Sequence, residues 1–393
     1  MWYSRSGAIA VLCTLALAAC DGGGGGDAAV SRDSAGVRIV GNDRGTWTER
    51  TAWTVEEQPV FEVGLQRDVN YLLDRVPDAA RLSDGRVVIA NSGSGELRFY
   101  DARSKFLRKV GRKGDGPGEF RGLALVRRIR GDSLVAYDGA GGRVSIFDPQ
   151  GKFVRSLETR DPLSPPYRLV DVFNDGALLL YRSEKRFNSL PRSSVTRDTL
   201  TLLRRDPARE TLDSLATFPG RESVLQIQMN NGQIQNVNVT NYPFMKETMV
   251  VAGGDAFYVG LNEAFSIERR REDGTLERVI RRAHESEPVR GAYLDSLKSV
   301  EGATFEGVPI PDALPAFGAL KVDEGGNLWV QSFPYPGSPP KRWEVFDPSG
   351  KLLGAVTLPP RFVPTQIGDD FVLGVARTDD DVEVVRMYRL RKP

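Results

Sequence analysis

The chain has 393 residues, with 53 basic and 52 acidic side chains and a formal net charge of +1. This balance gives no overall field that would attract nucleic acid or an anionic membrane surface, so we expect neither to bind the folded part. Cys13 and Cys20 are the two cysteines of the sequence, and both precede the main body. Burial without disulfides must therefore stabilise a body of about 360 residues, which is long enough to supply it.

Residues 1–19 predict a signal peptide. Arg5 supplies the positive charge, and residues 7–16 form an apolar stretch too short to span a membrane. Leu17-Ala18-Ala19-Cys20 follows and resembles the bacterial lipobox, which implies that Cys20 carries a lipid and becomes the mature N-terminus. An ordinary secretory signal with an incidental cysteine is the alternative. Residues 20–36 are interpreted as the lipidated cysteine with a flexible linker, so we expect a body tethered by lipid alone on the extracytoplasmic (periplasmic) side of a bacterial membrane.

A repeat of short strands begins after the linker. Strand-like runs at residues 84–90, 97–101 and 106–110 return in the same order at residues 131–137, 144–148 and 153–157, about forty-five residues later. A glycine precedes the second strand of each unit, at Gly85, Gly131, Gly176, Gly254, Gly326 and Gly368. This periodicity is typical of a β-propeller. Residues 37–393 are therefore predicted to form one all-β domain, a six-bladed β-propeller of four-stranded antiparallel blades.

The first two units are joined by residues 111–120, Gly-Arg-Lys-Gly-Asp-Gly-Pro-Gly-Glu-Phe. Between such units, this glycine-rich segment resembles the blade junction of NHL-type six-bladed propellers. The resemblance implies an architecture and not a reaction, because propellers host unrelated functions.

Residues 112–120 of the junction each have an expected role. The structural members are Gly114, Gly116 and Gly118, which would take positive φ, Pro117, which stiffens the path, and Phe120, which anchors the loop in the core. The remaining members are candidates to meet a ligand: Arg112, Lys113, Asp115 and Glu119. For Glu119, capping of neighbouring backbone amides is an equally open interpretation.

The end of the chain lacks an outer strand for its last blade. Residues 37–40 and 59–63 are spare strand candidates, and either could close the ring and remove exposed sheet edges. Two insertions, at about 222–242 and 283–315, are assigned to blade junctions. The first predicts a hairpin around Asn231-Gly232, and the second contains one short amphipathic helix at about residues 286–300. We therefore expect the long segments to gather on one rim of the propeller.

The sequence lacks the residues that most kinds of catalytic site require. His284 is the single histidine of the sequence, so a multi-histidine zinc site is unavailable, and we interpret His284 as a surface residue. Residues 127–130, 269–271 and 379–381 are interpreted as solvated edges and turns. No catalytic residue, metal ligand or cofactor is assigned.

Two function classes stay open. We favour a binding or scaffold module, active as a monomer, that holds a protein, peptide or glycan on its loop-decorated face. The alternative is a hydrolase or lyase with calcium at the central channel mouth, as in propeller lactonases. Carboxylates converging on that mouth would favour the enzyme, whereas an apolar or Arg-lined mouth would favour binding.

Overall fold

The computed structural model describes residues 29–159, 167–184, 193–206, 211–231, 233–241, 244–284, 287–289, 293–295, 311–334 and 342–393. The predicted signal peptide, Cys20 and residues 21–28 lie outside this range, as does most of the predicted helix, of which residues 293–295 are helical. β1 (Ala29–Ser34) falls within the segment expected to be linker.

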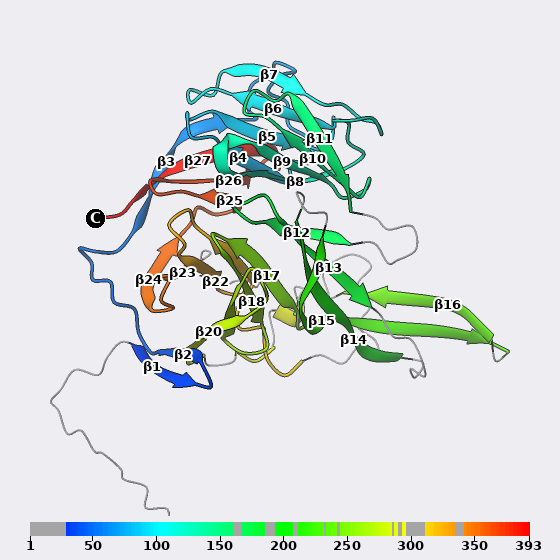
Figure 1. Cartoon of the computed structure of the whole chain (residues 1–393), viewed down its shortest axis with the longest axis vertical. Coiled ribbons are helices and arrows are strands. Elements are labelled where there is room, and N and C mark those ends of the chain that lie inside the picture. The colour runs from blue at the N-terminus through cyan, green and yellow to red at the C-terminus, as the bar shows by residue number, and fades with distance from the viewer. Residues whose placement is uncertain are drawn as a thin grey trace, which may run out of the picture.

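The described residues form six sheets of mainly antiparallel strands, and the sheets follow one another in chain order (Figure 1). The first holds β4 (Asp78–Arg81), β5 (Val87–Asn91), β6 (Glu96–Tyr100) and β7 (Phe106–Val110), and the second holds β8 (Leu123–Arg128), β9 (Leu134–Asp138), β10 (Arg143–Phe147) and β11 (Phe153–Glu158). The third holds β12 (Arg168–Val172), β13 (Leu178–Glu184), β14 (Ser193–Arg205), β15 (Leu212–Asn230) and β16 (Gln233–Thr240). The fourth holds β17 (Thr248–Gly253), β18 (Ala256–Leu261), β19 (Ser266–Arg271) and β20 (Leu276–Arg282), extended by β2 (Val37–Asn42) and β1. The fifth holds β21 (Ala319–Val322), β22 (Leu328–Gln331), β23 (Arg342–Phe346) and β24 (Leu352–Thr357), and the last holds β25 (Phe362–Ile367), β26 (Phe371–Arg377), β27 (Glu383–Arg391) and β3 (Thr54–Val63).

Turn chemistry sets the strand boundaries. The six predicted glycines each precede the second strand of a sheet, and all but Gly368 take positive φ. The turn at residues 148–152 joins β10 to β11, where the Asp148 carboxylate accepts hydrogen bonds from the backbone N–H groups of Gln150 and Lys152. Asp347 holds the turn between β23 and β24 in the same way. These carboxylates replace backbone partners that a tight turn leaves unpaired, so the turns serve the scaffold.

Apolar side chains fill the spaces between neighbouring sheets. Phe99 of β6, Phe120 and Phe147 of β10 are fully buried in one cluster between the first two sheets. First strands of different sheets also contact one another, as β4 does β8 and β17 does β21. Sheets that stack face to face with their first strands toward a common centre make a β-propeller.

The N-terminal strap, residues 29–63, crosses three sheets. β3 pairs with β27 as the outer strand of the last sheet, which confirms one of the two predicted candidates. The other candidate, β2, pairs in parallel with β20 instead. Between them, the Asn42 side chain bonds the Gly350 carbonyl and the Leu352 N–H, and the Trp47 N–H donates to the Leu353 carbonyl.

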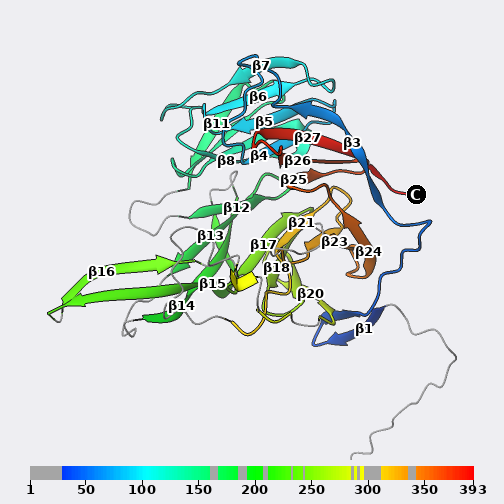
Figure 2. The same cartoon turned by 180° about the vertical axis from the view of Figure 1, so that it is seen from behind.

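Residues 222–242 lie between the body of the third sheet and β17, the first strand of the fourth, as their assignment to a blade junction predicts. They also enlarge the third sheet, because β15 continues through Asn230 and returns as β16. The predicted hairpin around Asn231 is confirmed, and Asn231 takes a φ of 49°. The alternation of apolar and amide residues keeps the chain extended beyond the body of the sheet, with one shift of register between Gln228 and Met229. Figures 1 and 2 both show the β15–β16 hairpin projecting away from the molecule.

Candidate functional site

The junction loop at residues 111–120 has most of its expected backbone. Gly114 and Gly118 take positive φ, at 155° and 74°, and Phe120 is fully buried, as predicted. Gly116 does not take positive φ, which corrects the prediction. Its N–H instead donates to Glu119 Oε2 at 2.9 Å, so a hydrogen bond and not a left-handed conformation fixes the path at this point. Pro117 is exposed on the outside of the loop.

Three of the four candidate ligand residues already form ion pairs or hydrogen bonds with residues in or near the loop. Glu119 accepts both the Gly116 N–H and Arg112 Nε, the latter at 2.6 Å, so the capping interpretation is confirmed. These bonds, with the backbone N–H foremost, lower the pKa of the Glu119 carboxyl. Asp115 pairs with Arg121.

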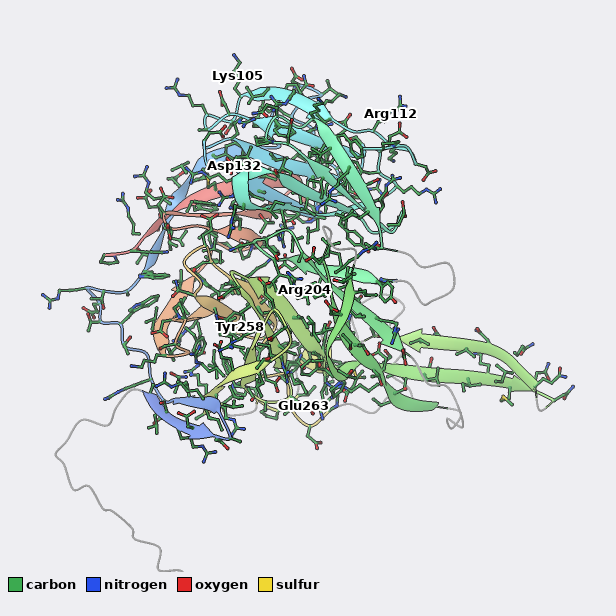
Figure 3. All side chains as sticks on the ribbon, in the orientation of Figure 1. Lys105, Arg112, Asp132, Arg204, Tyr258 and Glu263 are labelled. Atoms are coloured by element: carbon green, nitrogen blue, oxygen red, sulfur yellow. The ribbon has the colours of Figure 1, made fainter. Side chains whose placement is uncertain are left out.

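Lys113 is exposed, and its ammonium group donates no hydrogen bond to a described residue. Arg112 lies on the outer surface (Figure 3). Lys113 is therefore the junction side chain with most freedom to meet a ligand.

A cavity of about 930 Å³ opens at the same end of the sheets as the junctions. The starts of β12, β17 and β21 line it, together with the end of β13 and parts of β14 and β15. Its polar wall includes Arg168, Tyr181, Asp198, Arg221 and Glu247. Burial raises the pKa of the Tyr181 hydroxyl, and Arg168 acts in the opposite direction. The cavity thus offers charged, amide and hydroxyl groups to a polar ligand.

A charged cluster lies at the centre of the molecule, and the sequence did not predict it. Arg127 of β8 bonds Asp78 of β4 and, at 2.9 Å, Asp171 of β12. Lys321 of β21 interacts electrostatically with all three. Burial raises the pKa of Asp78, against the opposing effect of Arg127.

The interpretation of residues 127–130 as a solvated edge is therefore wrong for Arg127. A run of arginines gives no local sign of which side chain faces the propeller axis. The available signals were Asp78 directly before two alanines and Asp171 between two valines, because a carboxylate in an apolar inner strand needs a buried partner.

The carboxylates do not gather as a calcium site would require. Asp78 and Asp171 are both held by Arg127, and within the described ranges no group of three or more His, Cys, Asp or Glu side chains could hold a metal ion. Asp381 pairs with Arg361 and Arg377 in an exposed turn, as expected for residues 379–381. His284 is exposed, as predicted.

Comparison with known proteins gives a likeness of fold. No family model matches the chain, and no curated protein matches it. A solved structure described as an exported protein of Bacteroides fragilis NCTC 9343 is 14% identical, with a TM-score of 0.50 over 90% of this chain and 99% of that one. A gluconolactonase from Xanthomonas campestris is 14% identical over 81% of this chain and 88% of that one, with a TM-score of 0.43. Virginiamycin B lyase from Staphylococcus aureus is 9% identical over 86% and 99%, with a TM-score of 0.41.

The described part of the chain contains no helix with the length and apolar character needed to cross a membrane.

Proposed function

We propose that this protein is an exported β-propeller whose six sheets are its six blades. We propose further that it holds a protein, peptide or glycan on the face that carries the 111–120 loop and the other connections between sheets, here called the junction face. In this proposal the protein is a monomer, and lipid on Cys20 tethers it to the membrane. The fold that it shares with a protein described as exported supports an extracytoplasmic place.

The cavity of about 930 Å³ carries the binding proposal. It opens where the junctions and the links between second and third strands meet, and loops from several blades can supply side chains there without disturbing the sheets. The β15–β16 hairpin adds a second polar surface beside it, since Ser223 and Asn241 at its base line the cavity and bond each other at 2.7 Å. Amides and hydroxyls of this kind suit the hydrogen-bonding groups of a peptide or a sugar.

The calcium-dependent alternative finds little support in the central carboxylates. A calcium site needs carboxylate oxygens free to converge on one point. Arg127 hydrogen-bonds both Asp78 and Asp171, so a metal would have to displace a guanidinium that is paired with both carboxylates.

Partner capture from membranes tests the binding proposal. The double change Lys113→Ala with Asp115→Ala is expected to weaken capture while leaving the melting temperature nearly unchanged, because both side chains are exposed. Removal of the 224–239 hairpin should also weaken capture, but it takes away the buried side chains of Val224 and Leu225, so its melting temperature is expected to fall. Matched controls are Gln150→Ala and Ser349→Ala in the opposite-face turns. Full capture by both junction-face variants, with loss in the controls, would show that the opposite face binds.

A further inference from the structure

A second cavity, of about 410 Å³, lies at the other end of the sheets. Its walls come from the later residues of the first strand in every sheet, β4, β8, β12, β17, β21 and β25, and from the turns that follow several of them. It therefore sits on the central axis and opens away from the junction face. Its volume falls in the range of small-molecule sites, about 300 to 1,000 Å³.

Lys321 is distinctive among the charged side chains that line this cavity. Arg127 is bonded by Asp78 and Asp171, Arg128 by Glu324, and Asp323 by Asn327 and Trp329. The Lys321 ammonium group donates no hydrogen bond to any described residue, although it lies within the field of Arg127, Asp78 and Asp171. An ammonium group has three N–H donors, so Lys321 can donate to an acceptor on a molecule bound in the cavity.

The rest of the lining mixes polar side chains, among them Thr365 and Gln366, with apolar ones. Small and aliphatic side chains from all six first strands contribute: Ala79, Ala80, Val126, Val172, Val251, Ala252, Val322 and Ile367. Asn174 lies exposed at the edge of the cavity. The cavity therefore offers both hydrogen-bonding groups and an aliphatic surface to a small organic molecule.

We propose that this central cavity binds a small carboxylic acid, with the carboxylate on Lys321 and the apolar body against the aliphatic wall. The charges in and beside the cavity nearly cancel, with three positive side chains (Arg127, Arg128 and Lys321) and four negative ones (Asp78, Asp171, Asp323 and Glu324), so the site attracts its ligand at short range and not through a strong field. A carboxylate supplies the acceptor oxygens that Lys321 lacks, in a bond strengthened by charge on both partners.

Protonation of Lys321 couples to this binding. Burial lowers the pKa of Lys321 below its ordinary 10.5, Arg127 lowers it further, and Asp78 and Asp171 act in the opposite direction. A bound carboxylate favours the charged amine, so binding raises this pKa. Affinity for a carboxylate should consequently fall as pH rises. This fall should occur at a pH below 10.5, the ordinary pKa of a lysine.

Calorimetric titration of the soluble domain with benzoate and with neutral benzamide tests the site. Benzoate is expected to bind saturably, one per chain, and benzamide to bind about tenfold or more weakly, because it lacks the charge that Lys321 meets. Lys321→Met should weaken benzoate binding by about tenfold or more and leave benzamide unaffected. Lys351→Met, an exposed lysine in a turn of the same sheet, is the matched control and should bind benzoate as the unchanged protein does.

A second variant keeps the test independent of the buried lysine. Asn174→Trp places a large ring at the exposed edge, so it should block entry of both probes while the melting temperature stays unchanged. Equal binding of benzoate and benzamide, benzoate binding unaffected by Lys321→Met, or no saturable binding to the unchanged protein would each overturn the proposal. None of these results depends on capture of a partner at the junction face, so the two proposals can fail separately.

Discussion

Glu96 and Arg98 form a buried ion pair that fixes a neighbouring loop. Both side chains are less than a tenth exposed, and Arg98 Nη2 lies 2.9 Å from Glu96 Oε2. Arg98 also donates to the carbonyls of Val69 and Leu72, which fixes the segment between β3 and β4. Burial alone would raise the pKa of Glu96, but bonds from Lys109, Ser94 and Arg98 outweigh it and lower that pKa.

Glu96→Gln should destabilise the fold by about 3 kcal/mol, because it leaves the Arg98 guanidinium buried without its counter-charge. The pKa of Glu96 is lower in the folded state than the 4.5 of the free side chain, so its stabilisation is present above pH 4.5 and is lost as pH falls through the folded value. The difference in melting temperature between variant and unchanged protein should therefore shrink in acid.

Glu56→Gln is the control for this measurement, since Glu56 pairs with Arg391 at the surface. Such exposed pairs contribute roughly 0 to 1 kcal/mol. A variant at Glu96 that melts like the one at Glu56 would contradict the assigned role.

At this scale the sequence predicted local roles better than distant pairings. The burial of Phe120 followed from a large apolar residue at the end of a glycine-rich loop, and the capping by Glu119 from a carboxylate near free backbone amides. The pairing of Arg127 with Asp78 and Asp171 joins three different sheets. No local pattern specifies such a contact, because it depends on which side chains of the first strands point to the axis.

Among the elements, the N-terminal strap has the largest consequence for stability. Phe61 and Val63 of β3 are fully buried against the neighbouring sheets, and β3 covers the edge of β27. Without it, the last sheet would expose a long unpaired edge, which favours aggregation.

Deletion of residues 28–64 should therefore lower the melting temperature far more than deletion of residues 21–27. The first removes a strand that pairs with β27 and two that extend the β17–β20 sheet. The second removes only residues expected to be linker. Thermal unfolding of the two truncations side by side is the measurement, and equal melting temperatures would contradict a stabilising role for the strap.

The strands also show what the spacing of residue types along the sequence does not predict. The spacing of glycines placed the second strand of every sheet correctly, because tight turns restrict which residues can occupy them. The same reasoning placed a hairpin between the third and fourth sheets but did not predict that it extends the third sheet, in which its first half continues β15, a strand of 19 residues, and its second half forms β16. Alternation shows that a segment is extended but does not show which neighbour it pairs with.

For the whole molecule, the class of fold was predictable and the size and lining of its cavities were not. Repeated strand and turn spacing specifies a propeller because each unit must bury its faces against the next. How much space stays open at each end of the sheets depends on side-chain size around the ring. These volumes arise only when six distant strands meet.

Tethering is tested at this scale by Cys20→Ala. If lipid on Cys20 holds the protein at the membrane, the variant should be released or keep its signal peptide, because the thiol is the acceptor of the lipid. Membrane fractionation with a labelled fatty acid is the measurement. A protein that fractionates with the membrane equally in both forms, and takes no label when unchanged, would contradict lipidation.

The pairing of β3 with β27 also determines when the fold can be completed during synthesis. Glu62 and Arg386, which bond across these strands, are 324 residues apart. At a synthesis rate of about 5 to 20 residues per second, Phe61 and Val63 wait roughly 15 to 65 seconds for their partners to be made. The ring cannot close until nearly the whole chain has left the ribosome. A chain that must cross a membrane before it folds gains from this delay, because the contact that completes the molecule is the last one that can form.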